Sequence, residues 1–345
     1  MKAAVYYGIE DIRIEDIPHP ECPPEGVIVK IKYAGICGTD VRNYYQGTHK
    51  LKPPMVTGHE ASGKVVQIGE RHNIQKVGDL LAINPIIYCG KCHYCKNKMS
   101  SLCQDLKEFG FQYPGTFQEY MSIPGEVFDR GMVLPVPEGL PLKDAAISEP
   151  PASCLYAQEK ADTGKGDCIA IFGAGPVGCI HIQIARLREV SKIAVIDISS
   201  QKLKMAEPFG ADEYIDNSTP GFKQAIDKIT GGIGFDKIIV TAPAAGAVEQ
   251  SLEFVRKRGL IIIFAGLPRD NPYIRLDSNR IHYNDITLTG HFGQEKRHLR
   301  QSLELLRQKK IDADKLISHV LDLKDIKKGF ELIMQKKALK VLLRP

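Results

Sequence analysis

The segment Gly173-Ala174-Gly175-Pro176-Val177-Gly178 places three glycines between an apolar run, 168–172, and a helical pattern that continues to Arg188. In a G-x-G-x-x-G turn of this kind, the first glycine allows the tight turn and the second lets backbone approach a pyrophosphate. The third allows close packing of helix on strand. Pro176 suits the first helical turn, where its missing N–H costs little. The segment predicts a dinucleotide site at a helix N-terminus; the alternative is the same turn in an α/β domain that binds no nucleotide.

Strand-like and helical patterns alternate from about residue 160 onward, which is typical of a doubly wound parallel sheet. A helical pattern such as 247–255 separates most of the strand candidates. These candidates are 168–172, 193–196, 213–215, 237–240, 260–264 and 286–288. Six strands suit a complete dinucleotide-binding domain, so we predict an α/β domain of the Rossmann type over residues 151–290.

Asp197 stands at the end of the second predicted strand, 19 residues after Gly178. A carboxylate at this place accepts hydrogen bonds from both ribose hydroxyls and repels a 2′-phosphate, so NAD is favoured over NADP. Lys202 is the nearest cation that follows and is a further candidate for contact with the cofactor.

The regions on either side of this domain have a different pattern. Residues 1–125 are β-rich, with alternating runs such as 26–33 and 63–69 between frequent prolines and glycines. After Gly290 the sequence predicts two amphipathic helices, 298–309 and 325–334, and a final strand, 339–343.

Charge and hydropathy exclude several classes of protein. The 345 residues carry 46 Lys and Arg against 41 Asp and Glu, a net charge of +5 without a long basic run, which gives nucleic acid little to bind. No apolar run approaches the ~18 residues of a membrane span. The N-terminus reaches glycine and charged residues too early for a signal peptide, so we expect a cytoplasmic protein.

Four of the nine cysteines lie within fifteen residues, at Cys89, Cys92, Cys95 and Cys103. In a reducing compartment a disulfide scaffold is a poor interpretation. Four thiolates in one loop predict a closed, structural zinc site. An iron–sulfur cluster is the competing reading, because C-x2-C-x2-C also suits iron.

A second set of metal-ligating residues lies upstream, in the runs 35–40 and 58–60, which contain Cys37, His59 and Glu60. Taken singly, Cys37 would be a core thiol and His59 a satisfied histidine. Together with the four-cysteine loop, the glycine turn and Glu149-Pro150, they make the sequence resemble the zinc-dependent medium-chain dehydrogenase/reductase family over essentially its whole length. The resemblance is closest to the sorbitol (polyol) dehydrogenase branch.

The resemblance implies a GroES-like catalytic domain formed by residues 1–150 and 291–345, with the Rossmann domain inserted and the active site in the cleft between them. It implies two zinc ions in each chain, one structural and one catalytic, and a homodimer or homotetramer. Cys37 and His59 would bind the catalytic zinc. Glu149 and Glu60 are the two candidate carboxylates, and which of them binds directly stays open.

The resemblance also assigns roles around the reaction. Thr39 would take the hydroxyl proton into a relay through the cofactor ribose, and Asp40 would orient the zinc ligands. Two loops would line the nicotinamide; they contain Ala265, Gly266 and Leu267 in one case and the run 290–292 in the other.

The sequence departs from the polyol branch around the substrate. Arg42 and Asn43 stand where that branch often has a histidine and a tyrosine, and Gly293-Gln294 stands where it often has Arg-Tyr. Arginine does not act as a base near neutral pH. We therefore expect an alcohol other than sorbitol: a secondary hydroxyl of another polyol, a cyclitol or a sugar alcohol.

Three alternatives stay open. A polyol phosphate of the galactitol-1-phosphate type would use His49, Lys50 and Lys52, whose other interpretation is a solvated loop. A threonine dehydrogenase is the second, and an amino-acid substrate separates it. A nucleotide-binding sensor without activity is the third, and an unchanged Cys37→Ser variant would support it.

Overall fold

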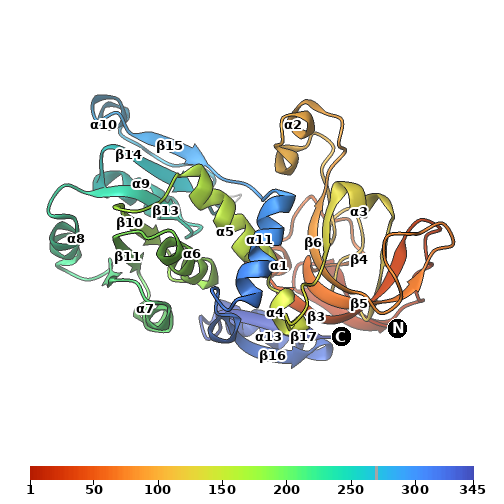
Figure 1. Cartoon of the computed structure of the whole chain (residues 1–345). Helices are drawn as coiled ribbons and strands as arrows, with labels where there is room; N and C mark the ends of the chain where they lie inside the picture. The colour runs from red at the N-terminus through yellow and green to blue at the C-terminus, as the bar shows by residue number, and fades with distance from the viewer. Residues whose placement is uncertain (269–270) are drawn as a thin grey trace. The chain divides into compact units, whose positions relative to one another are not determined.

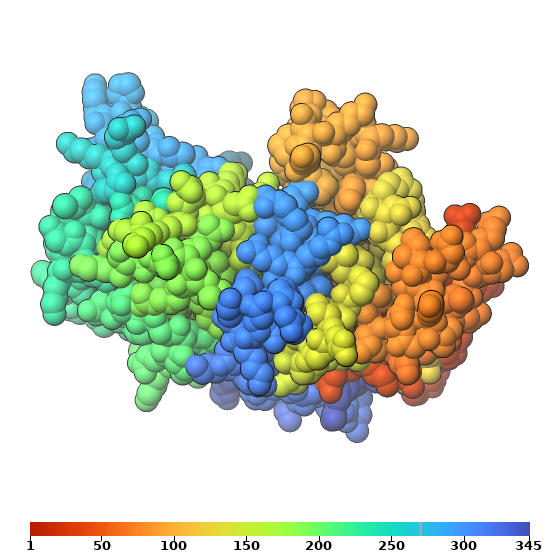
Figure 2. All heavy atoms as spheres, viewed as in Figure 1, coloured from red at the N-terminus to blue at the C-terminus, as the bar shows by residue number. Residues whose placement is uncertain are grey.

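The computed structural model describes residues 1–268 and 271–345. The chain forms two compact units, the first made of Met1–Ala152 with Gln294–Pro345 and the second of Ser153–Gly293. Figures 1 and 2 show the chain in the same view. The chain returns to the first unit after Gly293, three residues beyond the predicted boundary at residue 290, so His291 belongs to the second unit.

The second unit is built on one parallel sheet of six strands in the order β12-β11-β10-β13-β14-β15 (Figure 1). Every neighbouring pair in this sheet is parallel. The strands are β10 (Cys168–Phe172), β11 (Lys192–Asp197), β12 (Glu213–Asp216), β13 (Phe235–Val240), β14 (Val255–Ile263) and β15 (Thr287–Gly290). The strand order reverses between β10 and β13, where doubly wound sheets bind their ligands. The predicted α/β fold is confirmed.

Helices connect these strands and cover the sheet. They are α5 (Glu149–Lys160), α6 (Pro176–Leu187), α7 (Ser200–Ala206), α8 (Phe222–Thr230), α9 (Ala245–Phe254) and α10 (Ser278–Tyr283). Helix α6 packs on β10 and β11, and α9 packs on β13 and β14. The predicted helix 247–255 was one residue too long at its end, because Val255 pairs with Phe235 and opens β14. Phe264, predicted as strand, lies just after β14.

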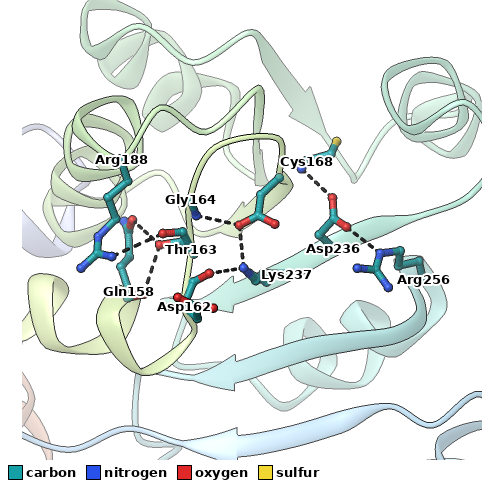
Figure 3. A network of polar contacts seen from close by, with 10 residues as sticks. Gln158, Asp162, Thr163, Gly164, Cys168, Arg188, Asp236, Lys237 and Arg256 are labelled. Carbon is teal, nitrogen blue, oxygen red and sulfur yellow. Dashed lines mark hydrogen bonds and ion pairs between the residues drawn. The ribbon is translucent and has the colours of Figure 1, made fainter.

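A polar network links residues at the amino-terminal ends of the central strands β10 and β13 (Figure 3). Lys237 Nζ lies 2.6 Å from Asp167 Oδ2. Asp236 accepts a hydrogen bond from Cys168 N at 2.7 Å and pairs with Arg256 at 2.6 Å. These contacts neutralise charges at the amino ends of the strands. The glycine turn follows β10 and therefore lies at the opposite, carboxyl-terminal ends of these strands.

The first unit is β-rich, as predicted, and its main sheet runs β16-β17-β3-β5-β6-β7, with β8 paired to β3 and β9 to β6. A smaller sheet has the order β2-β1-β4. The strands are β1 (Lys2–Gly8), β2 (Asp11–Asp16), β3 (Val27–Ile36), β4 (Met55–Val56), β5 (Glu60–Ile68), β6 (Leu80–Ile87), β7 (Lys107–Glu108), β8 (Tyr120–Ile123), β9 (Gly131–Pro135), β16 (Ile317–Asp322) and β17 (Lys340–Arg344).

The C-terminal segment completes this first unit, because β17 pairs antiparallel with β3. The predicted helices 298–309 and 325–334 correspond to α11 (Lys296–Arg307) and α13 (Ile326–Met334). Apart from the turn 207–209, which lies in a helical pattern that the sequence predicts up to about Gly210, the shorter helices and 3-10 turns were not predicted, because they have few apolar positions. They are α1 (Gly38–Gln46), α2 (His93–Lys96), α3 (Glu126–Arg130), α4 (Leu142–Ala145), α12 (Ala313–Leu316), η1 (Ser100–Leu102), η2 (Glu207–Phe209) and η3 (Leu323–Asp325).

Candidate active site

Cys37, His59 and Glu60 come together in the first unit, each with one ligand atom within 4.8 Å of the others. Cys37 is the N-cap of α1, directly after β3, while His59 and Glu60 stand where β5 begins. Strands β3 and β5 are antiparallel partners, with Gly35 opposite Glu60. The end of one strand and the start of its neighbour therefore present all three side chains at one place.

Glycines make room for this cluster. A Cβ atom on Gly35 would lie 2.6 Å from Glu60 Oε2, so the Glu60 carboxylate occupies the space that a side chain would fill. Gly58 has φ +89°, and a Cβ atom there would lie 2.7 Å from the Phe117 ring. Both positions require glycine, one for space and the other for space and backbone conformation.

Asp40 links two members of the cluster. Its Oδ2 accepts a hydrogen bond from Cys37 N at 2.9 Å, and its Oδ1 lies 3.3 Å from His59 Nδ1. Burial lowers the pKa of His59, but Asp40 and Cys37 outweigh burial and hold that pKa well above its ordinary value. Asp40 is thus placed to orient the imidazole.

The cluster has the character of a metal site. Glu60 is fully buried, and its Oε1 has no hydrogen-bond partner within the described part of the chain. A buried carboxylate oxygen left unpaired is costly, and a cation held beside it would remove that cost. A thiol, an imidazole and a carboxylate are all ligands that zinc accepts. The residues present fit zinc.

Glu149, the other candidate carboxylate, begins α5 and is half-buried. Burial and the charge of Glu60 raise its pKa to about 7, and the charges of His59 and Lys340 oppose that rise. Among the described residues, the group of ligand atoms around Cys37 includes Glu60 and does not include Glu149. Thr39 lies half-buried in the first turn of α1, and Asn43 is buried with its carbonyl accepting from Tyr6 OH at 3.1 Å.

Cys89, Cys92, Cys95 and Cys103 form the other group with ligand atoms within 4.8 Å of one another. The loop stands out as an amber lobe in Figure 2. Cys89 N donates to Cys103 Sγ at 3.2 Å, and Cys92 N donates to Cys89 Sγ at 3.4 Å. Backbone hydrogen bonds from Gln104 and Cys95 lower the pKa of Cys92 to about 6. Donors aimed at sulfur favour thiolates, which are the form that binds metal.

The glycine turn of the second unit has the geometry that a phosphate site needs. Gly173 has φ +115°, and a Cβ atom on Gly178 would lie 2.0 Å from Gly173 O. Gly175 is the N-cap of α6, and a Cβ atom placed on it meets no atom within 4 Å. The first and third glycines are therefore required by the fold, while the second leaves open space at the helix N-terminus.

Asp197 ends β11 beside this turn. Its Oδ2 accepts from Ala174 N at 2.8 Å and its Oδ1 accepts from Ser199 N at 2.9 Å. The carboxylate is thus held at the edge of the glycine turn. Lys202 lies in the first turn of α7, where its backbone N–H donates to Ser199 Oγ at 3.4 Å.

An aromatic stack at the two predicted nicotinamide loops was not predicted from the sequence. Phe264 immediately precedes Ala265-Gly266-Leu267 and stacks on His291, with ring centroids 4.9 Å apart and an interplanar angle of 15°. Phe264 also meets His181 at 88° and 4.9 Å. Ser153 Oγ lies 3.1 Å from His291 Nε2. These rings come from three elements with no common sequence pattern, so only the fold reveals them.

A Rossmann sheet with its glycine turn and a β-rich unit with a Cys–His–Glu cluster together define the class of dehydrogenases that pair a nicotinamide dinucleotide with zinc. Two family models match the chain: the alcohol dehydrogenase GroES-like domain over residues 23–138 and the zinc-binding dehydrogenase over residues 176–308. The chain belongs to the zinc-dependent medium-chain alcohol dehydrogenase family, in its sorbitol dehydrogenase-like branch. It is an NAD-dependent oxidoreductase that acts on an alcohol.

Known proteins of this family are similar over the full chain. A sorbitol dehydrogenase of Halalkalibacterium halodurans is 30% identical, covering 100% of this chain and 99% of that protein. An L-threonine 3-dehydrogenase of Rhizobium etli is 29% identical, covering 99% and 98%. The crystal structure of 2R,3R-butanediol dehydrogenase from Bacillus subtilis has a TM-score of 0.90 at 29% identity, covering 100% and 99%. None of the helices in the described residues has the length and apolar character that crossing a membrane requires.

Proposed function

We propose that this enzyme oxidises a secondary hydroxyl of a polyol, cyclitol or sugar alcohol, with NAD as the hydride acceptor and catalytic zinc at Cys37, His59 and Glu60. The observation that carries the proposal is the cluster itself. Cys37, His59 and Glu60 would give zinc three protein ligands, the number that catalytic zinc sites have, whereas the four-cysteine loop would give it four, as structural sites do. The similarity to a sorbitol dehydrogenase supports a substrate with several hydroxyls.

Bound zinc would supply a Lewis acid that lowers the pKa of the substrate hydroxyl, and NAD would accept the hydride. The side chains of this chain have the remaining tasks. Asp40 orients His59 through the 3.3 Å contact, and Thr39, two residues after Cys37, takes the hydroxyl proton. Glu149 faces the same group from α5 and presents a second carboxylate to a hydroxyl or to solvent.

The cofactor proposal rests on Asp197. Its carboxylate lies beside the glycine turn and would accept from the ribose hydroxyls, whereas a 2′-phosphate would meet its negative charge. The four cysteines of the lobe would hold the structural zinc. We also propose that the enzyme is a homodimer or homotetramer of the cytoplasm, where its nine thiols stay reduced; light scattering of the purified protein measures the oligomer.

L-Threonine is the second candidate substrate, favoured by the similarity to L-threonine 3-dehydrogenase. Polyol phosphates form a third arm, because Lys50 and Lys52 are exposed near the end of α1 and carry positive charge. The three classes of substrate carry different charges near the reacting hydroxyl, so assays with one panel of substrates distinguish them.

The test is NAD reduction at 340 nm by the zinc-loaded enzyme with polyols, cyclitols, sugar alcohols, polyol phosphates and L-threonine. We expect turnover of at least one unphosphorylated polyol or cyclitol, lost in Cys37→Ser. Cys168→Ser is the matched control, because Cys168 belongs to neither metal-competent cluster. Turnover of threonine alone, or of phosphates alone, would replace the proposed substrate class. Equal activity of Cys37→Ser and Cys168→Ser would rule out the proposed metal site.

A further inference from the structure

The four-cysteine lobe is fastened to the start of α11 by one carboxylate. Ser100 Oγ donates to Glu295 Oε2, Ser101 N donates to Glu295 Oε1 at 3.2 Å, and Ser101 Oγ donates to the same oxygen at 3.3 Å. Both serines are buried, at 7% and 1% exposure. Ser100 also shares the turn of a cysteine ligand, because Cys103 N donates to Ser100 O at 3.1 Å.

Hydrogen bonds to an ionised group are stronger than neutral ones, and three of them converge on this carboxylate. Glu295 is the N-cap of α11, and its own N–H donates to His298 Nδ1 at 3.1 Å. The helix therefore holds Glu295 by its backbone N–H, and the lobe holds it by its carboxylate. A movement of one would be transmitted to the other.

The residue before it, Gln294, faces the opposite way, into the buried interior of the first unit. Gln294 is fully buried, and its Nε2 donates to Asn84 Oδ1 at 3.2 Å. Asn84 lies on β6, the strand that leads into the four-cysteine loop. Gln294 thus contacts the strand below the lobe through Asn84, and Asn84 in turn contacts Ser148, the residue before Glu149.

The backbone next to Glu149 is held by the same helix. Ser302 Oγ, on α11, donates to Ser148 O at 2.7 Å, and Asn84 Nδ2 lies 3.4 Å from Ser148 Oγ. Ser148, Asn84 and Ser302 are all fully buried. Each broken bond in this buried network would leave a polar group without water, so the contacts hold Ser148 in place.

We propose that Glu295 is a positioning residue that couples the four-cysteine lobe to the Glu149 carboxylate of the active site. Glu295, the N-cap of α11, holds the lobe. Ser302 of α11, and Gln294 through Asn84, hold Ser148, the residue before Glu149. The proposal rests on the proposed function, since it needs metal in both clusters. An ordered lobe then keeps Glu149 in place, and a loosened lobe lets it shift.

Two variants remove the hydrogen bonds between Glu295 and the two serines, which we call the tether, from opposite sides. Ser100→Ala/Ser101→Ala removes the two hydroxyl donors and leaves the helix cap untouched, while Glu295→Gln removes the charge and keeps the size. Lys296→Met is the matched control. Its Nζ donates to Phe128 O at 2.8 Å and fastens the same helix end to α3, without touching Ser100 or Ser101.

The experiment uses the full-length protein with zinc in the lobe and cobalt(II) in the catalytic cluster. Three quantities are measured: the rate at which a chelator removes zinc from the lobe, the visible absorption of the cobalt, and kcat and KM for the alcohol. In both tether variants we expect zinc release about tenfold faster, a shifted cobalt band and a lower kcat. Lys296→Met should change none of them more than about twofold.

The outcomes separate the coupling from the proposed function. A tether variant that loses zinc faster but keeps the wild-type cobalt band and kcat would overturn the coupling alone. Zinc release unchanged in both variants would also overturn it, because Glu295 would then not hold the lobe. Wild-type protein that takes metal only in the lobe would overturn the proposed function, and the coupling with it.

Discussion

Lys340 Nζ lies 2.5 Å from Glu60 Oε2, and both side chains are out of solvent, at 7% and 0% exposure. Three adjacent strands create this contact, because β17 pairs with β3 and β3 pairs with β5. Burial lowers the pKa of Lys340, but Glu60 and Cys37 outweigh burial and raise it, so the ammonium group stays charged. A lysine near the end of the chain therefore balances the carboxylate beside the proposed catalytic metal.

Removing this lysine should be costly. In Lys340→Met the Glu60 carboxylate would stay buried without a counter-charge, and we expect the free energy of unfolding of the metal-free protein to fall by about 3 kcal/mol. Urea titration followed by circular dichroism measures it. The double variant Lys340→Met/Glu60→Gln should recover most of the loss, since it buries no charge. Lys2→Met is the control, because the Lys2–Asp16 pair is exposed at 54% and 72%. A loss no larger than that of the control would contradict the expectation.

The sequence was sufficient for the features that depend on neighbours in the chain. The glycine turn, the alternation of strands and helices and the close spacing of the four cysteines are local patterns. The alternation predicted the six-stranded sheet, and the cysteine spacing predicted the four-cysteine cluster. The runs around Cys37 and His59 are also local. Because β3 and β5 pair, two such runs come together in the structure.

Contacts between residues far apart in the sequence could not be predicted, because they follow no local sequence pattern. Lys340 lies 280 residues from Glu60, and Glu295 lies 194 residues from Ser101. Lys340 and Glu295 are charged residues in terminal or amphipathic segments, so the sequence pattern predicts that both lie on the surface. The sequence also could not rank Glu60 against Glu149, because both precede or begin an element and only the strand register decides which one lies beside Cys37.

Asp197 should set the choice of cofactor. Asp197→Asn keeps an acceptor for Ala174 N but removes the charge, so we expect NADH affinity to fall about tenfold and the discrimination against NADPH to shrink. Fluorescence titration measures both, with little background because the chain has no tryptophan. Asp216→Asn is the control, since Asp216 ends the neighbouring strand in register with Asp197. If the two variants bind both cofactors alike, Asp197 does not contact the ribose.

Phe264 should position the nicotinamide loops through its ring. Phe264→Leu removes the stack on His291, so we expect NADH binding several-fold weaker and KM for NAD raised more than kcat is lowered. Phe235→Leu deletes a similar volume from the core of the same unit, where β13 begins. Both variants should lose stability, but only Phe264→Leu should lose cofactor affinity. Equal loss of affinity in the two would mean that the stack only stabilises the fold.

His181 should make the protein sensitive to acid. Burial, together with the charge of His291, lowers its pKa to about 3, whereas an unfolded histidine titrates near 6.5. Between these values the unfolded chain binds a proton that the folded chain does not, so stability rises with pH and is lost as pH falls below about 6.5. The loss from this one group between pH 6.5 and 5 is about 2 kcal/mol.

The His181→Gln variant tests this directly. Glutamine keeps an acceptor for Gln158 Nε2, which lies 3.1 Å from His181 Nδ1, but it does not titrate. Urea midpoints measured between pH 5 and 7 should therefore change less with pH in His181→Gln than in the wild type. His282→Gln replaces an exposed histidine of the same unit and should keep the wild-type slope. A slope that His181→Gln leaves unchanged would show that the acid sensitivity arises from other groups.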